Sequence, residues 1–181
     1  MIVRPATLDD ALAVAAVYAH HVLHGTGTFE EAPPSPDEIA RRMKAVLDRG
    51  FPWVVVEDEG RVVAYAYAGP YRERVAYRFT AEDSVYVAPD AKGKGVGRAV
   101  LSAVVSACEA LGVRQLMAVI GDSGNEGSIG LHRSLGFEQT GVGRSVGFKH
   151  GRWVDIVHMQ KPLNGGDGRA PDAPGITLTG H

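Results

Sequence analysis

The sequence predicts an α+β fold in which one mixed, mostly antiparallel sheet of about seven strands is flanked by four helices. Short stretches rich in β-branched and aromatic residues indicate the strands, and stretches of helical periodicity indicate the helices. Two pairs of neighbouring strands are joined by short turns, which is typical of antiparallel hairpins. Helices interrupt these hairpins along the chain, and this order is typical of a mixed sheet.

The N-terminal third of the chain predicts one strand and two helices. Each helix begins at a hydroxyl side chain that can cap it, with an acidic residue three positions later, as in a capping box. A glycine follows the end of each helix. The predicted elements are a strand over Ile2–Arg4, a helix from Thr7 to about His24, a loop over 26–34 and a helix from Ser35 to about Arg49.

The rest of the chain predicts six strands and two helices, followed by a tail. The predicted strands are Trp53–Glu57, Arg61–Ala68, the central strand Ser84–Val87, Val113–Ile120, and a hairpin of Phe137–Phe148 with Trp153–Met159. The predicted helices are Arg98–Leu111 and Asn125–Leu135. From Asn164 the composition shifts to Gly, Pro, Asp and Thr without periodicity, so we expect a domain over residues 1–163 and a flexible tail over residues 164–181.

Length and composition exclude several classes of protein. A chain of 181 residues is suited to one domain, and its net charge of -2 predicts no attraction to nucleic acid or to an anionic membrane. No apolar run approaches the roughly 20 residues of a membrane span, and the first residues lack the layout of a secretory signal. The single cysteine, Cys108, rules out internal disulfides and indicates a cytoplasmic protein, and we interpret it as a core residue.

Three glycines at alternate positions, interleaved with cations, follow the central strand and lead into a helix. Glycine lets the backbone approach a ligand closely, and the first turn of a helix presents free N–H groups to an anion. The order of the glycines fits neither the P-loop nor the dinucleotide fingerprint. We therefore expect an anion site that belongs to neither of those two classes. The residues of this glycine loop are Lys92, Gly93, Lys94, Gly95, Val96, Gly97 and Arg98.

The pattern P-x-x-K-G-x-G-x-G, which follows a strand ending in V-Y-V, resembles the acetyl-CoA pyrophosphate loop of the GNAT N-acetyltransferases. Further motifs resemble the phosphinothricin and methionine sulfoximine N-acetyltransferases of that family, which acetylate the α-amine of small amino acids and analogues. The resemblance covers residues 1 to about 162 and implies the GNAT fold. The further motifs are Thr26-x-Thr28-Phe29, Ala76-Tyr77-x-x-Thr80-Ala81-Glu82, Asn125-x-x-Ser128-x-x-Leu131-His132 and Gly147-Phe148-Lys149-His150-Gly151-x-Trp153-x-Asp155.

The resemblance implies acetyl-CoA as cosubstrate and assigns its contacts. Glu82 corresponds to the family's catalytic base, which takes a proton from the ammonium group of the acceptor. A backbone N–H near Val87 would stabilise the charge that develops on the thioester oxygen. His132 lies near the place where many relatives carry a thiolate-protonating tyrosine, and proton transfer and plain packing are both open to it. The implied acetyl-CoA contacts are Val85, Tyr86, Val87, Gly93, Lys94, Gly95, Val96, Gly97, Arg98, Asn125 and Ser134.

Arginine side chains are suited to bind the acidic groups of such a substrate, because a guanidinium can bind two oxygens at once. Arg72 and Arg74 lie shortly before Glu82 and are the candidates, and Phe29 and Tyr77 could form an apolar wall. The resemblance also implies a homodimer in which the final hairpin completes the pocket.

Two other functions stay open. The same fold could acetylate the N-terminus of a protein, which requires an open groove rather than an arginine-lined pocket. The chain could also be a non-catalytic acetyl-CoA-binding module, although the presence of Glu82 argues against it. His20 and His24 lie one helical turn apart, a spacing that could bind a metal. No metal is expected, because no acidic or cysteine side chain accompanies them.

Overall fold

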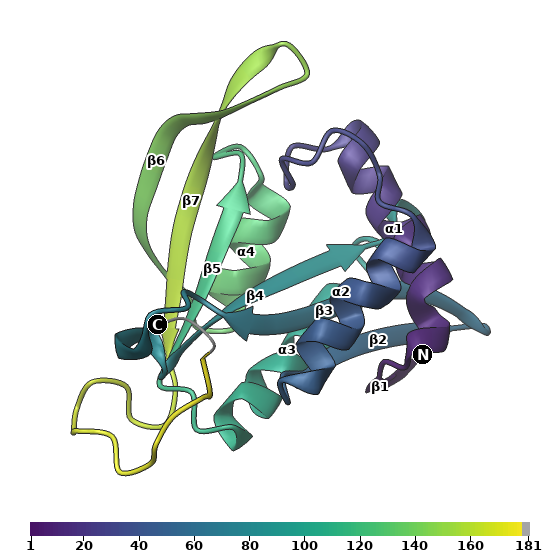
Figure 1. Ribbon diagram of the computed structural model, residues 1–181. Helices are drawn as coiled ribbons and strands as arrows, with labels where there is room; N and C mark the ends of the chain where they lie inside the picture. Colours follow the sequence, from purple (N-terminus) through teal and green to yellow (C-terminus); the bar gives the residue numbers. More distant parts are fainter. Residues whose placement is uncertain (179–181) are drawn as a thin grey trace.

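The structure, a computed structural model that describes residues 1–178, contains a single seven-stranded sheet (Figure 1). In chain order its strands are β1 (Ile2–Pro5), β2 (Trp53–Asp58), β3 (Arg61–Pro70), β4 (Thr80–Val87), β5 (Gln115–Gly121), β6 (Glu138–Lys149) and β7 (Arg152–Pro162). They lie side by side in the order β1-β2-β3-β4-β5-β7-β6. Only the β4–β5 pair is parallel among them, so the predicted mixed and mostly antiparallel sheet is confirmed.

Four α-helices flank the sheet, as predicted. They are α1 (Ala11–His24), α2 (Pro36–Asp48), α3 (Val96–Ala110) and α4 (Glu126–Ser134), and short 3-10 turns occur at η1 (Leu8–Asp10), η2 (Val75–Tyr77) and η3 (Pro89–Ala91). Side chains of β4 show which helix covers which face. Tyr86 packs against Tyr18 of α1, whereas Asp83 contacts His132 of α4. Because successive side chains of a strand point to opposite faces, α1 and α4 lie on opposite sides of the sheet. Within residues 1–178, none of the helices is long and apolar enough to cross a membrane.

The predicted helix caps are present. The Ser35 hydroxyl accepts a hydrogen bond from the Glu38 backbone N–H at 3.2 Å, and the Asp10 carboxylate accepts one from the Thr7 backbone N–H at 2.8 Å. The chain after Thr7 first makes the 3-10 turn η1, however, so α1 begins at Ala11, later than predicted. The capping residues therefore predict where each helical segment begins, but they do not predict whether its first turn is an α-helical or a 3-10 turn.

The central strand begins four residues earlier than predicted, at Thr80 instead of Ser84. These added residues pair on both sides: Glu82 lies opposite Gly69 of β3, and Thr80 lies opposite Gln115 of β5. The extension is therefore decided by two neighbouring strands and not by the local residue types. It places Glu82 inside the strand, where its direction is fixed by the pleat.

Cys108 is completely buried on the inner face of α3, as its interpretation as a core residue requires. Burial raises the pKa of its thiol to about 12, which keeps the side chain protonated and unreactive at neutral pH. It packs in the same cluster as Val100 and Val104 of α3.

Residues 163–178, the described part of the segment after β7, contain neither helix nor strand, yet they make specific contacts with the domain. Arg114, only 6% exposed, donates from Nε to the Gly166 carbonyl at 2.9 Å and from Nη2 to the Arg169 carbonyl at 3.0 Å. The Ile176 backbone N–H donates to the Arg78 carbonyl at 2.7 Å. Over residues 164–178, polar groups of the domain therefore contact a segment that has few apolar residues, and the flexibility of this tail stays a prediction.

Candidate active site

A cleft opens where β4 and β5 separate. Their parallel pairing runs from Thr80 opposite Gln115 to Asp83 opposite Ala118 and ends there. Beyond this point the two strands point apart, as their arrowheads in Figure 1 show. A cleft of about 580 Å³ lies between them, lined by residues 84–87 of β4 and 118–120 of β5. The inner end of the cleft is therefore at Asp83 and its mouth is at the glycine loop.

The glycine loop has the backbone geometry that requires glycine. Gly93 and Gly95 have φ values of +75° and +79°, in the left-handed region, and Gly95 is the residue that caps α3. A Cβ built on Gly97 would lie 3.3 Å from the side chains of Val87 and Leu131, so glycine lets α3 approach β4 and α4 closely. Gly95, Val96 and Gly97 line the cleft, which puts the N-terminal turn of α3 beside it. This arrangement fits the pyrophosphate of acetyl-CoA.

The main chain of β4 presents alternate residues to the cleft. The Ala88 N–H donates to the Val63 carbonyl at 2.8 Å, and therefore faces β3. The N–H and C=O of one strand residue point the same way and alternate along the strand, so those of Val85 and Val87 face the cleft. Those of Tyr86 face β3, where Tyr65 is its register partner. The Tyr86 side chain still lines the cleft, but its main chain is used by the sheet.

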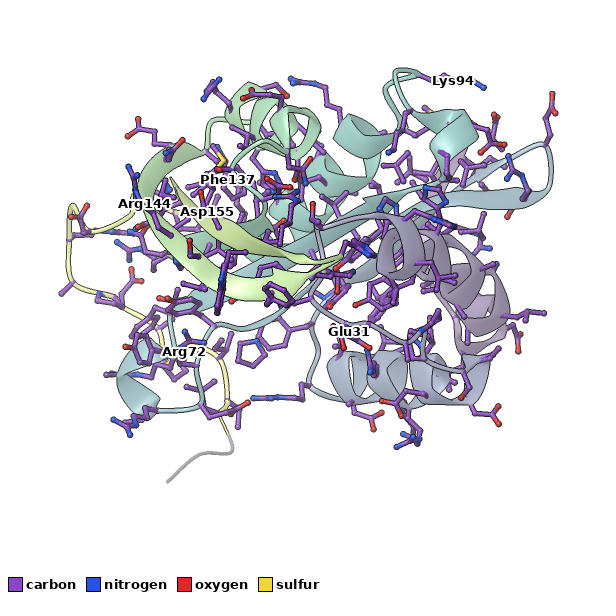
Figure 2. The ribbon with its side chains drawn as sticks, turned by 90° about the horizontal axis from the view of Figure 1, so that it is seen from above. Glu31, Arg72, Lys94, Phe137, Arg144 and Asp155 are labelled. Carbon is purple, nitrogen blue, oxygen red and sulfur yellow. The ribbon has the colours of Figure 1, made fainter. Side chains whose placement is uncertain are left out.

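The cations and polar residues assigned to acetyl-CoA occupy different places. Lys92 and Arg98 line the cleft, and the Arg98 guanidinium also donates to the Ser134 carbonyl at 2.8 Å and to its hydroxyl at 2.7 Å. Ser134 does not line the cleft and instead joins the end of α4 to α3 through Arg98. Lys94 is exposed at the outer tip of the loop, pointing away from the molecule (Figure 2). Asn125 lines the cleft and caps α4, where its Oδ1 accepts from the Ser128 N–H.

Glu82 itself is not among the residues that line the cleft, but Asp83 and Ser84, which follow it in β4, both are. Its side chain lies on the other face of the strand from Asp83. Burial raises the pKa of its carboxyl group; the Arg72 guanidinium acts against this shift, and the neighbouring Asp83 adds to it. Ser84 shares the face of Glu82 and lines the cleft, so the cleft reaches that face of β4. A half-buried carboxylate with a raised pKa is better suited than a carboxylate with an ordinary pKa to act as a base near neutral pH.

Asp83 and His132 form a buried pair at the inner end of the cleft. Asp83 Oδ2 lies 3.0 Å from His132 Nε2, and His132 Nδ1 donates to the Ser128 carbonyl at 2.8 Å. The other oxygen, Oδ1, is buried and has no hydrogen-bond partner within the described residues. The bonded carboxylate raises the pKa of His132 against the effect of burial. Both ring nitrogens are used inside the protein, and the pair joins α4 to β4.

The residues predicted to bind the acceptor lie in two places. Arg72 is the cation that acts on Glu82, and its guanidinium stacks on the Tyr71 ring at 4.7 Å. Tyr77 meets the same ring edge-on at 5.6 Å, whereas Arg74 is exposed at the start of η2. Figure 2 shows Arg72 far from the tip of the glycine loop.

Phe29 belongs to the loop between α1 and α2 and lies against β6. A Cβ built on Gly147 would overlap the Phe29 ring, so the absence of a side chain at Gly147 makes this contact possible. The same loop is held by Lys149, which is 2% exposed and donates from Nζ to the Thr28 carbonyl at 2.8 Å. The loop therefore closes over the end of the long β6–β7 hairpin.

Two residues of the cleft were not identified from the sequence. They are Asp83 and His21, which carry no motif of their own in the sequence. His21 lines the cleft, and its Nε2 lies 2.9 Å from the Val87 carbonyl oxygen. No local pattern indicates either contact, since the partners are 49 and 66 residues away in sequence. Within residues 1–178, no group of three or more His, Cys, Asp or Glu side chains could hold a metal ion.

Comparisons with known proteins agree with this geometry. A sequence model described as the acetyltransferase (GNAT) family matches residues 17–137. The chain is 55% identical to a phosphinothricin N-acetyltransferase of Alcaligenes faecalis over 94% of this chain and 86% of that protein. It is 38% identical to an L-methionine sulfoximine/L-methionine sulfone acetyltransferase of Salmonella typhimurium, covering 96% and 99% of the two chains.

A solved structure is similar over nearly the whole fold. It is the crystal structure of a GNAT superfamily phosphinothricin acetyltransferase from Sinorhizobium meliloti in complex with acetyl-CoA. The TM-score is 0.92 at 46% identity, and the alignment covers 98% of this chain and 97% of that chain.

Proposed function

Because the chain belongs to the acetyltransferase (GNAT) family, we propose that it moves the acetyl group of acetyl-CoA to the α-amine of a small amino-acid-like acceptor, such as phosphinothricin or methionine sulfoximine. One observation carries the proposal: the cleft that begins at the glycine loop reaches Asp83 and Ser84, the residues that follow Glu82 in β4, and burial raises the pKa of the Glu82 carboxyl group. The names of the two relatives support the acceptor class.

In this proposal acetyl-CoA supplies the thioester, and the chain holds and polarises it. The glycine loop and the first turn of α3 bind the pyrophosphate through backbone N–H groups. Main-chain groups of Val85 and Val87 bind the pantetheine arm. The Val87 N–H faces the cleft and stabilises the negative charge that develops on the thioester oxygen. Asn125 contributes from the other wall of the cleft.

Glu82 is the proposed base. Its carboxylate takes a proton from the acceptor's ammonium group, directly or through water, and the neutral amine then attacks the thioester carbon. A C–N bond forms and the C–S bond breaks, and the leaving thiolate takes up the proton that the amine nitrogen loses, so that it departs as the thiol of CoA. Arg72 and Arg74 are the proposed partners of the acceptor's acidic groups, with Tyr77 and Phe29 as apolar walls. The effect of Arg72 on the Glu82 pKa supports Arg72 more strongly than Arg74.

Glu82→Gln tests the base. The amide keeps the size of the side chain and cannot accept the proton, so we expect kcat to fall by roughly 10²–10⁴-fold. Acetyl-CoA affinity, measured by calorimetric titration, should stay near wild type. A variant with wild-type turnover between about pH 6 and 9, the range in which a general base is usually examined, would show that Glu82 is not the base.

The competing functions differ in their acceptor. A protein N-terminal acetyltransferase should acetylate peptides faster than free amino acids, and a non-catalytic acetyl-CoA-binding module should acetylate neither. The proposal expects free amino acids and analogues with a carboxylate to have the higher kcat/KM. A panel of phosphinothricin, methionine sulfoximine, common amino acids and short peptides separates the three functions.

A homodimer and a cytoplasmic location complete the proposal. The β6–β7 hairpin exposes Phe148 and Trp153, which are 59% and 63% exposed and meet edge-on at 5.4 Å. A second copy packed on this hairpin would cover them, which supports a dimer. Sedimentation equilibrium tests it, and a monomer at micromolar concentration would contradict it. The only cysteine is a buried free thiol, which supports a reducing compartment.

A further inference from the structure

His21 reaches from α1 to the end of β4, at a place where the strand has lost its neighbour. Its Nε2 lies 2.9 Å from the Val87 carbonyl oxygen. A carbonyl can only accept a hydrogen bond, so Nε2 carries the proton and donates it. The contact joins two elements that frame the cleft from different sides, since α1 packs on β4 and His21 itself lines the cleft.

The Val87 carbonyl needs such a partner because the sheet does not supply one. Ala88 donates to β3, and the carbonyl of the same peptide group points the opposite way, toward the cleft. In a continuous sheet this carbonyl would accept from β5. Pairing with β5 ends at Asp83, four residues earlier, so β5 does not donate to the Val87 carbonyl and His21 does.

The surroundings of His21 hold its ring in place. The ring is half-buried and meets Tyr86 edge-on at a centroid distance of 5.3 Å. Burial lowers the pKa of His21; the bond to the Val87 carbonyl acts against this shift, and the nearby charges of Lys92 and His20 add to it. The ring is therefore neutral at neutral pH, with Nε2 as its single donor.

We propose that His21 is a positioning residue for acetyl-CoA, whose Nε2–H holds the Val87 carbonyl so that the Val87 N–H points into the cleft before the cosubstrate binds. Fixing the main chain of Val87 in advance lowers the entropy cost of ordering it when acetyl-CoA binds. The inference rests on the proposed use of the β4 main chain by acetyl-CoA. It adds a residue of α1 to a site whose other lining includes residues of β4, β5, α3 and α4.

The test compares two substitutions of His21. His21→Ala removes the donor, and we expect the Kd and KM for acetyl-CoA to rise about three- to tenfold. The kcat at saturating acetyl-CoA should stay near wild type, because the bound cosubstrate itself orders the strand end. His21→Gln keeps an N–H donor of similar reach and should restore most of the affinity. His24→Ala is the matched control, since His24 neither lines the cleft nor acts on the His21 pKa.

The outcomes separate this inference from the proposed function. Wild-type affinity in His21→Ala would overturn it, and so would a His21→Gln variant that binds as weakly as His21→Ala, because ring packing would then account for the loss. Titration of Gly95→Val in parallel tests the cleft itself. If Gly95→Val binds weakly and His21→Ala binds normally, only the role of His21 is wrong. If neither variant binds more weakly, the cleft assignment is wrong as well. Melting curves confirm that each variant is folded during the titration.

Discussion

Arg72 has two proposed roles, which can be measured separately. It binds the acidic groups of the acceptor, and its positive charge holds down the Glu82 pKa, which burial raises. For Arg72→Ala we expect kcat/KM on phosphinothricin to fall by about 10- to 150-fold, the loss of a hydrogen bond to a charged group. Acetyl-CoA affinity should not change, because Arg72 lies outside the cleft lining.

The second role appears in the pH profile. Glu82 works as the carboxylate, so activity is lost as the pH falls through its pKa. Without Arg72 that pKa is higher, and the acid limb of kcat/KM should move to higher pH. Arg72 and Arg74 are both exposed, but only Arg72 acts on the Glu82 pKa, so Arg74→Ala removes the same charge and serves as the control. An acid limb that stays in place in Arg72→Ala would contradict the assignment of Glu82 as the titrating base.

Among elements, the glycine loop allows a matched comparison. Gly95 and Gly50 have φ values of +79° and +76°, and a Cβ built on either meets nothing within 4 Å. Valine should therefore strain both backbones similarly, by roughly 1–2 kcal/mol each. Only Gly95 lies beside the cleft, so only Gly95→Val should weaken acetyl-CoA binding in a calorimetric titration. Equal affinities in the two variants would mean that the loop does not approach the cosubstrate.

The sequence predicted the start of an element correctly where the residues that determine this start lie close together in the chain. Ser35 caps α2 through an atom three residues away, so the start of α2 was predicted from the chain alone, whereas α3 begins at Val96, two residues before the predicted Arg98. The first half of β4 has no comparable local signal. Thr80 becomes part of a strand because β3 and β5 supply its partners, and these are fixed only when the sheet forms.

For the whole molecule, the contacts of the C-terminal segment predict a loss of stability on truncation. A chain ending at Leu163 leaves Arg114 without the carbonyls of Gly166 and Arg169. We expect Tm to fall by about 2–10 °C, as the loss of roughly one to two such hydrogen bonds implies. The kcat at 25 °C should stay near wild type, because the segment lies outside the lining of the cleft.

A chain ending at Leu178 is the control, since it keeps every described contact of the segment. If both truncated chains melt like the full chain, the segment contributes nothing to stability and the flexible tail of the sequence prediction is the better description. The boundary of the acetyltransferase domain after Leu163 stays a prediction that this comparison tests.

The amino-acid sequence by itself determined the class of the sheet, the number of helices and the loop that fits a pyrophosphate. Each of these depends on information within a few neighbouring residues, namely periodicity, caps and the φ that only glycine adopts easily. The motif order also determined the family, because several separated patterns had to agree.

Only the tertiary structure decided how the site is put together. The separation of β4 from β5 creates the cleft, because the pairing of the two strands ends at Asp83 opposite Ala118. Three side-chain contacts then frame the cleft: Arg98 with Ser134, Asp83 with His132 and His21 with Val87. Their partners are 36, 49 and 66 residues apart, so each contact forms only after the sheet and its helices have closed around the same point.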